Sequence, residues 1–398
     1  MLHVVGGSYR EVCISPDLVQ LYGSGGRAAT ALATVTDVTL HTFASRNRLD
    51  AAQRMAALGG FRLVATPSDI DVSFGYIHPL ASSQTDPPRG TFTPSDCIEI
   101  EASDRTALVF GMHEGRSSVK ARTIVYDPQD GLLPMPYSRS GCIALERLAL
   151  LMNAGEALKT TGAETLPDAG QMLVSQNAAD VAIIKSGPGG AMVFLEGRED
   201  PHLVPAFRTN AVFGIGSGDI FAAAFTHLWG QLQEDPVQAA EKASRAVSHY
   251  VETRSDLLSW EDETTLARMP VRVIPGKVYL AGPFFTMAQR WLVEEAREQF
   301  LGMGLDVFSP IHEVGRGPAE FVAPADLRGL ESCDRVFAIL DGFDSGTMFE
   351  LGYARKMGLP VYGYGELIAP EDSKMITGSG CHLIGDFATA VYHTAWRI

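Results

Sequence analysis

The strongest chemical signal lies near the end of the chain, in the segment 344–354. Asp344 and Glu350 follow a short apolar run at 336–340, which is typical of a buried strand. Open α/β sheets bind ligands in the loops that follow such strands. A carboxylate there can trap an oxocarbenium-like sugar carbon covalently, and a second carboxyl group can carry the proton of the leaving base. The segment predicts cleavage at an anomeric carbon, with Glu350 as candidate nucleophile at the start of a helix, where the helix dipole favours its ionised form.

The same residues also have structural interpretations. Thr347 and Glu350 have the spacing of a capping box, in which Glu350 only accepts a backbone N–H bond. Asp326 fits a solvated helix face, Asp344 fits a turn, and Tyr279 fits a buried core position. Only the combination of these positions favours a catalytic role over these structural interpretations.

Taken together, the motifs of residues 277–398 resemble the nucleoside 2-deoxyribosyltransferase family. They are the strand and glycine turn at 279–285, Asp326 ahead of Cys333 and Asp334, the motif at 344–354, and the run 358–361. The resemblance implies a flavodoxin-like parallel sheet and a ping-pong exchange of bases on a 2-deoxyribosyl group, without a cofactor. It implies Glu350 as the nucleophile, Asp326 as the proton-transfer group and Asp344 as the residue that holds sugar hydroxyls. The implied substrate-binding residues are Tyr279, Gly282, Pro283, Phe284, Gly346 and Thr347. Sites in this family are commonly completed by a neighbouring subunit, which implies a homo-oligomer.

An alternative lies inside this resemblance, because related members hydrolyse the N-glycosidic bond of nucleotides instead of exchanging bases. Such an enzyme needs an anion pocket for a 5′-phosphate. Residues 345–347 at a helix N-terminus, with Arg328 nearby in sequence, are suited to form one. The sequence leaves open nucleoside transfer, nucleotide hydrolysis, and a sensor or scaffold in which neither half of the chain turns over.

A glycine-rich segment at 214–219 is the main chemical signal of the first part of the chain. Gly216, Ser217 and Gly218 precede a helix-like run at 220–228, so their N–H groups and the helix start suit an anion. Asp219 is placed to take a proton from an attacking hydroxyl while phosphates lie over the amides. On its own, such a segment is more often a structural turn.

Three further segments accompany this loop. They are Gly25 and Gly26 entering a helix of small residues, Asn153 and Glu156 beginning another helix, and Lys185 and Gly187 ending a strand-like run in a tight turn. The carboxylate of Glu156 can act on a phosphate through a hydrated Mg²⁺. The structural alternatives are a polar helix face for Asn153 and Glu156, and hairpin chemistry at 189–190.

In this order the segments resemble the ribokinase-like, PfkB-type family of sugar and nucleoside kinases over residues 2–253. The resemblance implies phosphorylation of a sugar hydroxyl with ATP and Mg²⁺. The implied roles are catalytic base for Asp219, anion hole for Gly216, Ser217 and Gly218, metal motif acting through water for Asn153 and Glu156, and substrate-side glycine pair for Gly25 and Gly26. Lys185 and Gly187 complete the expected phosphate-binding set.

The first part of the chain also departs from that family's pattern. Thr30 stands where the family has Asn, and residues 213–215 read Phe-Gly-Ile where it has Asp-Thr-Thr. The usual early Asp has no clear equivalent, although Glu11 lies close. These departures leave open a domain that binds a nucleoside without phosphorylating it.

Strand-like and helix-like runs alternate along most of the chain, which predicts an α/β fold with parallel sheets. An acidic cluster followed by Pro-rich turns at 255–276 predicts a linker. We therefore expect a ribokinase-like α/β/α domain at 1–254 and a flavodoxin-like domain at 277–398.

Composition narrows the expected partners. The 398 residues carry a net charge of -15 and a pI of about 5.1, which disfavours nucleic acid and membrane surfaces and favours a small nucleoside, nucleotide or sugar. Five cysteines are scattered without metal-binding spacing, and no signal peptide or membrane span is recognisable. We expect a cytoplasmic protein.

Overall fold

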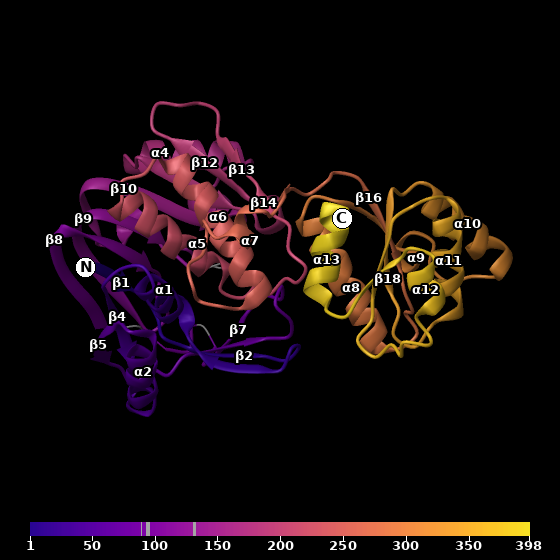
Figure 1. The fold of residues 1–398 in the computed structure, drawn as a ribbon, viewed down its shortest axis with the longest axis horizontal. Coiled ribbons are helices and arrows are strands. Elements are labelled where there is room, and N and C mark those ends of the chain that lie inside the picture. Colours follow the sequence, from indigo (N-terminus) through magenta and orange to yellow (C-terminus); the bar gives the residue numbers. More distant parts are fainter. Residues whose placement is uncertain (89, 93–95, 130–132) are drawn as a thin grey trace. The chain divides into compact units, whose positions relative to one another are not determined.

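The computed structural model describes residues 1–88, 90–92, 96–129 and 133–398. It divides into two compact units, Met1–Thr209 with Phe213–Pro270, and Asn210–Val212 with Val271–Ile398. In Figure 1, each unit has helices packed around its own sheet. The division after Pro270 falls inside the segment 255–276 that we expected to be a linker. Within the described ranges, no helix combines the length and the apolar character needed to cross a membrane.

The first unit is built on a nine-stranded sheet. Its strands lie in the order β13 (His202–Val204), β12 (Ala191–Leu195), β11 (Val181–Lys185), β10 (Ile143–Asn153), β9 (Gly115–Asp127), β8 (Asp96–Phe110), β1 (Leu2–Val5), β4 (Val38–Ala44) and β5 (Arg62–Pro67). β12 runs antiparallel to both of its neighbours, and the other pairs are parallel. This mixed sheet confirms the predicted α/β class.

Helices cover both faces of this sheet because alternate strand residues point to opposite sides. Ile183 packs into the core shared with α1 (Gly23–Ala33), α2 (Arg46–Gly59), α5 (Ser217–Phe225) and α6 (Pro236–Thr253). Ile184 packs into the core shared with α3 (Ala154–Thr161) and α4 (Leu166–Asn177). A single π-helical turn, η3 (Thr226–Gln231), continues α5, and the 3-10 turns η1 (Tyr137–Arg139) and η2 (Gly187–Gly189) lie in loops.

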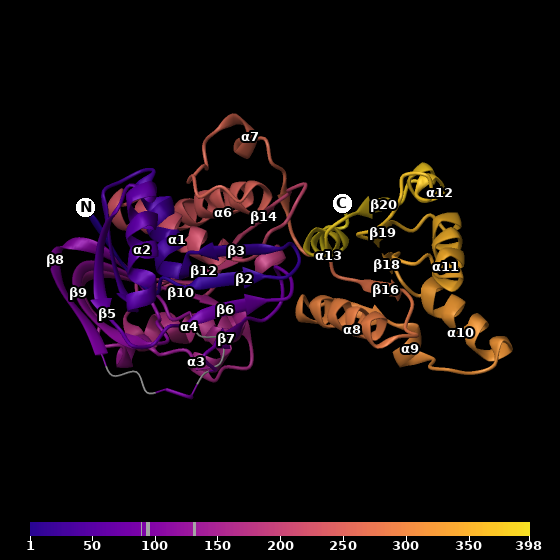
Figure 2. The ribbon, with the colours of Figure 1, turned by 90° about the horizontal axis from the view of Figure 1, so that it is seen from below.

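A second sheet of the first unit has four short strands. They lie in the order β3 (Leu18–Leu21), β2 (Arg10–Cys13), β6 (Ser73–Tyr76) and β7 (Gln84–Asp86), as Figure 2 shows. This sheet supplies Glu11, Phe74 and Tyr76 to the cavity described below. The remaining elements are α7 (Glu263–Leu266) and the short pair β14 (Ala206–Phe207) and β15 (Pro270–Val271).

The second unit contains a five-stranded sheet in which all neighbouring strands are parallel. The order is β17 (Asp306–Phe308), β16 (Lys277–Ala281), β18 (Arg335–Ile339), β19 (Val361–Tyr364) and β20 (His382–Ile384). α8 (Met287–Gly302) and α13 (Phe387–Trp396) pack on one face, and α10 (Ala319–Glu331) and α11 (Ser345–Lys356) on the other, as Figure 1 shows. Two short helices, α9 (Pro310–Glu313) and α12 (Lys374–Gly378), complete the unit. This strand order confirms the predicted flavodoxin-like sheet.

One buried cation holds the end of the second unit together. The guanidinium of Arg335, on β18, is fully buried. It donates to the backbone carbonyls of Thr394, Ala395, Ile274 and Pro275, and it pairs with Asp334. Because these bonds join carbonyls at the end of α13 and in the segment before β16 to a side chain of β18, this residue fixes the C-terminal helix against the strand that precedes the candidate site.

Candidate functional site

The chain order of the five-stranded sheet reverses between β16 and β18, and ligands of such sheets bind at the carboxyl ends of the strands at that point. The loop after β16 begins with Gly282. The loop after β18 leads to Asp344, the N-cap of α11. Two of the sequence motifs therefore meet at one edge of the sheet.

Glu350 and Tyr279 are joined directly at this edge. The hydroxyl of Tyr279 donates to Oε1 of Glu350 over 2.6 Å. Tyr279 is fully buried on β16, and its ring stacks on Phe308. Burial raises the pKa of Glu350 to about 7; the Tyr279 hydrogen bond acts against this rise, whereas the charges of Asp326 and Asp344 add to it. The carboxylate is thus held in one orientation in a poorly solvated place.

The expectation that Glu350 begins a helix is wrong. α11 begins at Ser345, so Glu350 is its sixth residue and lies beyond the first turn. The N-cap is Asp344, whose side chain accepts from the backbone N–H and the hydroxyl of Thr347. Glu350 therefore neither serves as the acceptor of a capping box nor lies where the helix dipole acts strongly.

Asp326 lies on α10, and it adds a second carboxyl group near Glu350. Its Oδ1 atom is buried and has no hydrogen-bond partner among the residues that the structure describes. Burial raises the pKa of this carboxyl group. An interior acceptor of this kind is costly unless a bound group satisfies it, so the geometry favours a ligand at this position.

The residues expected to bind the substrate lie around the same edge. Gly282 allows a close approach, since a Cβ atom there would lie 3.0 Å from Ile339. Pro283 is buried, and the ring of Phe284 packs on Phe285. Gly346 and Thr347 surround the Asp344 carboxylate, so an acidic group already uses the helix N-terminus that a 5′-phosphate would need.

The first unit contains a large cavity between its two sheets and the start of α5. Its volume is about 850 Å³, and its walls include residues from β2, α1, α3, β11 and α5. Of the residues expected to bind phosphate, Lys185, Gly187, Gly216, Ser217 and Gly218 line this cavity, and so does Asp219.

The segment that we expected to form an anion hole is centred on Gly216. This glycine is the N-cap of α5 with φ 84°, a conformation that disfavours side chains. Lys185 lies beside it, because a Cβ atom at Gly218 would be 3.5 Å from the Lys185 ammonium. A cation and a helix start thus face the same space, an arrangement that suits a polyphosphate.

Asn153 and Glu156 begin α3 as a reciprocal capping box. Each side chain accepts the other residue's backbone N–H over 2.9 Å. Within the described ranges, no cluster of three His, Cys, Asp or Glu side chains is arranged to bind a metal. Asp127, whose Oδ1 atom is buried without a partner among the described residues, pairs with Lys185. These oxygen donors fit a hydrated Mg²⁺ held through water.

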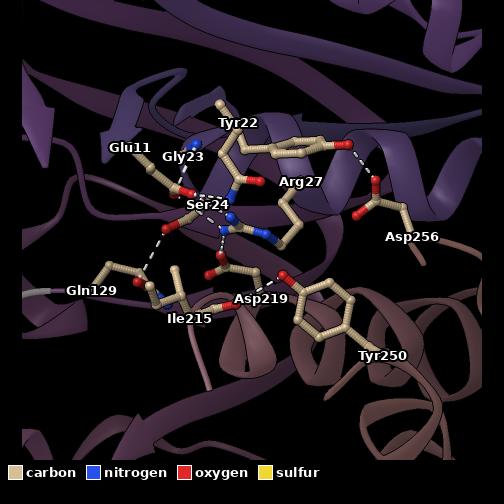
Figure 3. A network of polar contacts seen from close by, with 11 residues as sticks. Glu11, Tyr22, Gly23, Ser24, Arg27, Gln129, Ile215, Asp219, Tyr250 and Asp256 are labelled. Carbon is tan, nitrogen blue, oxygen red and sulfur yellow. Dashed lines mark hydrogen bonds and ion pairs between the residues drawn. The ribbon is translucent and has the colours of Figure 1, made fainter. Parts of the chain in front are cut away.

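A buried ion-pair network, which the sequence did not reveal, lies next to Gly216 in the expected anion hole. Arg27 donates through Nη1 to Oδ2 of Asp219 over 2.7 Å and to Oε1 of Glu11 over 3.3 Å, and its Nη2 pairs with the other Glu11 oxygen. Figure 3 shows the guanidinium between the two carboxylates, close to Tyr22. The available signal was a single charged residue after Gly26 in a run of small residues.

The glycine pair Gly25 and Gly26 is placed differently from our expectation. The two residues are buried in α1, and the residues that line the cavity from this segment are Gly23, Ser24 and Arg27. A Cβ atom at Gly25 would lie 2.6 Å from the Gly6 carbonyl. Gly25 is therefore needed for the close packing of α1 on the end of β1.

Comparison with known families and structures agrees with this architecture. The sequence profile described as nucleoside 2-deoxyribosyltransferase matches residues 278–378, and that of the pfkB family carbohydrate kinases matches residues 148–262. The ribokinase structure from Giardia lamblia is 13% identical, with a TM-score of 0.50, and the alignment covers 67% of this chain and 98% of that one. At this identity it shows a shared fold.

Two further relatives were found. A pyrophosphate-dependent kinase in the ribokinase family, solved with a pyrophosphate analog and myo-inositol, is 16% identical with a TM-score of 0.46, over 67% of this chain and all of its own. An uncharacterized protein of Ureaplasma parvum is 33% identical over 91 residues, which is 19% of this chain and 58% of that protein. The match thus spans little more than half of that relative.

The two profile matches fall in the two compact units, and each contains a part of the geometry described above. Asn153, Glu156, Lys185 and Asp219 lie within the first match, and Tyr279, Asp326 and Glu350 within the second. The chain therefore carries a PfkB-type, ribokinase-like domain followed by a nucleoside 2-deoxyribosyltransferase-family domain.

Proposed function

We propose that the second unit cleaves the N-glycosidic bond of a 2-deoxynucleoside and transfers the deoxyribosyl group through an ester on Glu350. The observation that carries this proposal is the hydrogen bond from Tyr279 to Glu350 Oε1, with the unpartnered carboxyl oxygen of Asp326 in the same group of acids. The bond leaves Oε2 as the oxygen that attacks the anomeric carbon.

The two half-reactions use the same two carboxyl groups. In the first, the bond between the anomeric carbon and the base nitrogen breaks, the ester to Glu350 forms, and Asp326 gives its proton to the departing base. In the second, a nitrogen of the incoming base attacks the anomeric carbon, the bond from that carbon to the Glu350 oxygen breaks so that Glu350 leaves as a carboxylate, and Asp326 takes the proton from the base nitrogen. The raised pKa of Asp326, caused by burial, supports a group that exchanges a proton in both directions.

A base-exchange assay tests this proposal. The protein is incubated with a 2′-deoxynucleoside and a different free base, and the products are identified by mass. We expect the new deoxynucleoside, together with a mass increase of one deoxyribosyl group on the peptide that contains Glu350 when the acceptor base is omitted. Release of base into water without exchange would contradict transfer and would favour the hydrolase.

For the first unit we propose binding of ATP with a hydrated Mg²⁺ in the 850 Å³ cavity, and binding or phosphorylation of a sugar or nucleoside beside Asp219. Support comes from Lys185 beside Gly218 at the start of α5, and from Glu156, which lines the cavity together with Asn153. Calorimetry with Mg·ATP tests donor binding. ADP formation with pooled sugars and nucleosides tests transfer: a rate above that of Asp219→Asn would support phosphorylation, and an equal rate would support binding alone.

The alternative for the whole chain is a nucleoside 5′-monophosphate N-glycoside hydrolase with an impaired, ligand-sensing kinase-like unit. The ion pair between Asp219 and Arg27 favours the impaired kinase-like unit. The Asp344 carboxylate at the start of α11 disfavours a nucleotide substrate, because it occupies the place that a 5′-phosphate would need. We also propose that the protein acts as a homo-oligomer on small molecules.

A further inference from the structure

In the first unit's cavity, a side chain of the protein fills the space beside Asp219, where we propose that the phosphoryl acceptor binds. Arg27 is 1% exposed although it lies in the wall of the cavity. It is enclosed by Glu11 from β2, Asp219 from α5 and the ring of Tyr22, which lies 5.1 Å from the guanidinium carbon. Figure 3 shows that these groups approach it from different elements.

Both carboxylate oxygens of Glu11 accept hydrogen bonds from other groups of the protein besides Arg27. Oε1 of Glu11 also accepts from the backbone N–H of Gly23, and Oε2 accepts from the side chain of Gln20. A sugar hydroxyl that needs Glu11 as a hydrogen-bond acceptor must therefore displace existing bonds. Glu11 holds the arginine instead of offering its carboxylate to the cavity.

Asp219 is also held by Arg27. A general base needs to lie within hydrogen-bond reach of the proton that it removes. Oδ2 of Asp219 is already 2.7 Å from Nη1 of Arg27. Burial raises the pKa of Asp219, and the charge of Arg27 opposes this rise and so weakens the carboxylate as a base. The pair thus lowers the reactivity of the group that an acceptor hydroxyl would use.

The guanidinium also lies against the anion hole. A Cβ atom at Gly216 would be 2.3 Å from Nε of Arg27, so the arginine packs directly on the Cα atom of that glycine. A cation at this place suggests at first a contact with the transferred phosphate. Here, however, Nη1 and Nη2 are bound to carboxylates, while Nε lies against Gly216 and has no hydrogen-bond partner among the described residues.

We propose that Arg27 locks the kinase-like unit in a state that binds the phosphoryl donor without transferring its phosphoryl group, because its guanidinium bridges Glu11 and Asp219 where an acceptor hydroxyl has to enter. This inference rests on the proposed roles of Asp219 as base and of the cavity as a donor site. Removing the bridge opens the place to water or to a sugar hydroxyl. Asp219 then takes the hydroxyl proton, the oxygen bonds to the γ-phosphorus, and the bond from that phosphorus to ADP breaks.

The experiment compares the parent protein with Arg27→Ala, Asp219→Asn and the double variant. Mg·ATP binding is measured by calorimetry, and ADP formation is measured with water alone and with pooled sugars and nucleosides. We expect the parent to bind Mg·ATP and to form ADP no faster than Asp219→Asn. Arg27→Ala should form ADP at least about tenfold faster, since general-base catalysis typically contributes more than that, and the double variant should lose the gain.

Two controls separate a lock from a general loosening of the fold. Arg147→Ala removes a guanidinium that lies over Trp229 instead of between carboxylates, and it should leave ADP formation at the parent level. Free guanidinium ion added to Arg27→Ala should refill the gap and suppress the gained activity. If Arg27→Ala does not fold, Arg27→Lys takes its place, because an ammonium group cannot bridge two carboxylates as a planar guanidinium does, and it should also show a rise.

The possible results point to different conclusions. A parent protein that already turns over ATP through Asp219 and loses this activity in Arg27→Ala would overturn the lock and make Arg27 a phosphate ligand. A folded Arg27 variant that binds Mg·ATP as the parent does, yet stays inactive, would also overturn it. Failure of the parent to bind Mg·ATP would instead overturn the proposed donor site, and the lock with it.

Discussion

Tyr279 on β16 and Glu350 on α11 share a 2.6 Å hydrogen bond although 71 positions separate them in the sequence. The phenol hydroxyl stabilises the ionised carboxylate, while burial and two neighbouring acids favour the protonated form. The pKa of about 7 is the balance between these effects. Since the proposed nucleophile must be ionised, this balance sets the pH at which base exchange begins.

Tyr279→Phe should move the acid limb of the pH–rate profile upward. The variant loses the donor that favours the carboxylate, so the pKa of Glu350 rises further above about 7 and a higher pH is needed to ionise it. The measurement is kcat/KM for base exchange from pH 5 to 9. Tyr362→Phe is the matched control, because this buried tyrosine of β19 stacks on His382. An unchanged acid limb in Tyr279→Phe would contradict the coupling.

Asp326→Asn should move the same limb in the opposite direction. Removing a negative charge near Glu350 lowers the pKa of its carboxyl group, so the nucleophile ionises at a lower pH. Loss of the proton-transfer group should at the same time reduce kcat about 10²- to 10⁴-fold. Glu331→Gln is the control on the same helix, since Glu331 bonds the surface hydroxyl of Tyr353. A shift to higher pH, or an unchanged kcat, would count against the assignment of Asp326.

Glu350→Gln should abolish transfer and yet make the protein more stable above neutral pH. Because burial raises the pKa of Glu350, the folded state binds its proton more tightly than the unfolded state does. The stabilisation from that proton is complete below the unfolded pKa and is lost as the pH rises through about 7. Gln stays neutral, so we expect a gain of about 1–2 kcal/mol in the free energy of unfolding at pH 8 and little change at pH 4. Urea unfolding at the two pH values measures it, and an equal effect at both would refute the explanation.

Arg335→Met should destabilise the second unit strongly. The substitution removes a buried donor from four backbone carbonyls and from Asp334, at a cost of about 3–5 kcal/mol, although Ala395 and Asp334 each keep one backbone N–H donor. The expected result is an earlier denaturant transition for the second unit, together with loss of base exchange. Arg355→Met, which removes bonds to carbonyls near the surface, is the control and should cost less. Equal costs would show that burial of the cation is not the cause.

An oligomer contact should involve exposed aromatic residues of the second unit. Phe349 is 63% exposed and precedes Glu350 on α11, and Phe321, at 71%, lies on the same helix as Asp326. Apolar groups so exposed beside a candidate site favour a covering partner. We expect Phe349→Ser to lower the mass in light scattering and to reduce base exchange together, while unfolding of the isolated chain stays the same. Parent protein that is already monomeric would rule out this contact.

Much of the fold was predictable because the signals are local. Buried strands such as β11 and β16 appear as short apolar runs, and the alternation with helices predicts parallel sheets. The start of α3 at Asn153 and Glu156 was predicted, but the reciprocal capping box that these two residues form was not. The end of the first unit was harder to see, since Asp256 in the expected linker pairs with Tyr22, 234 positions earlier.

The candidate sites were predictable in their residue types but not in their electrostatics. The position of Glu350 beyond the first turn of α11 depends on Asp344 being the N-cap, whereas the sequence pattern suggested a cap at Thr347 and a turn at Asp344. The Arg27 network depends on three elements that are distant in sequence, and no spacing rule links Glu11, Arg27 and Asp219. Partners of this kind become visible only after the chain has folded.

The place of Glu350 on the second turn of α11 also constrains the order of events in any exchange. A side chain rooted in a regular helix and tied to Tyr279 has little freedom to swing, so a sugar esterified there stays where it was captured. The outgoing and incoming bases must then occupy the same binding site, one after the other. Each free base would therefore compete with the other for that site, and an excess of either base would slow exchange in both directions.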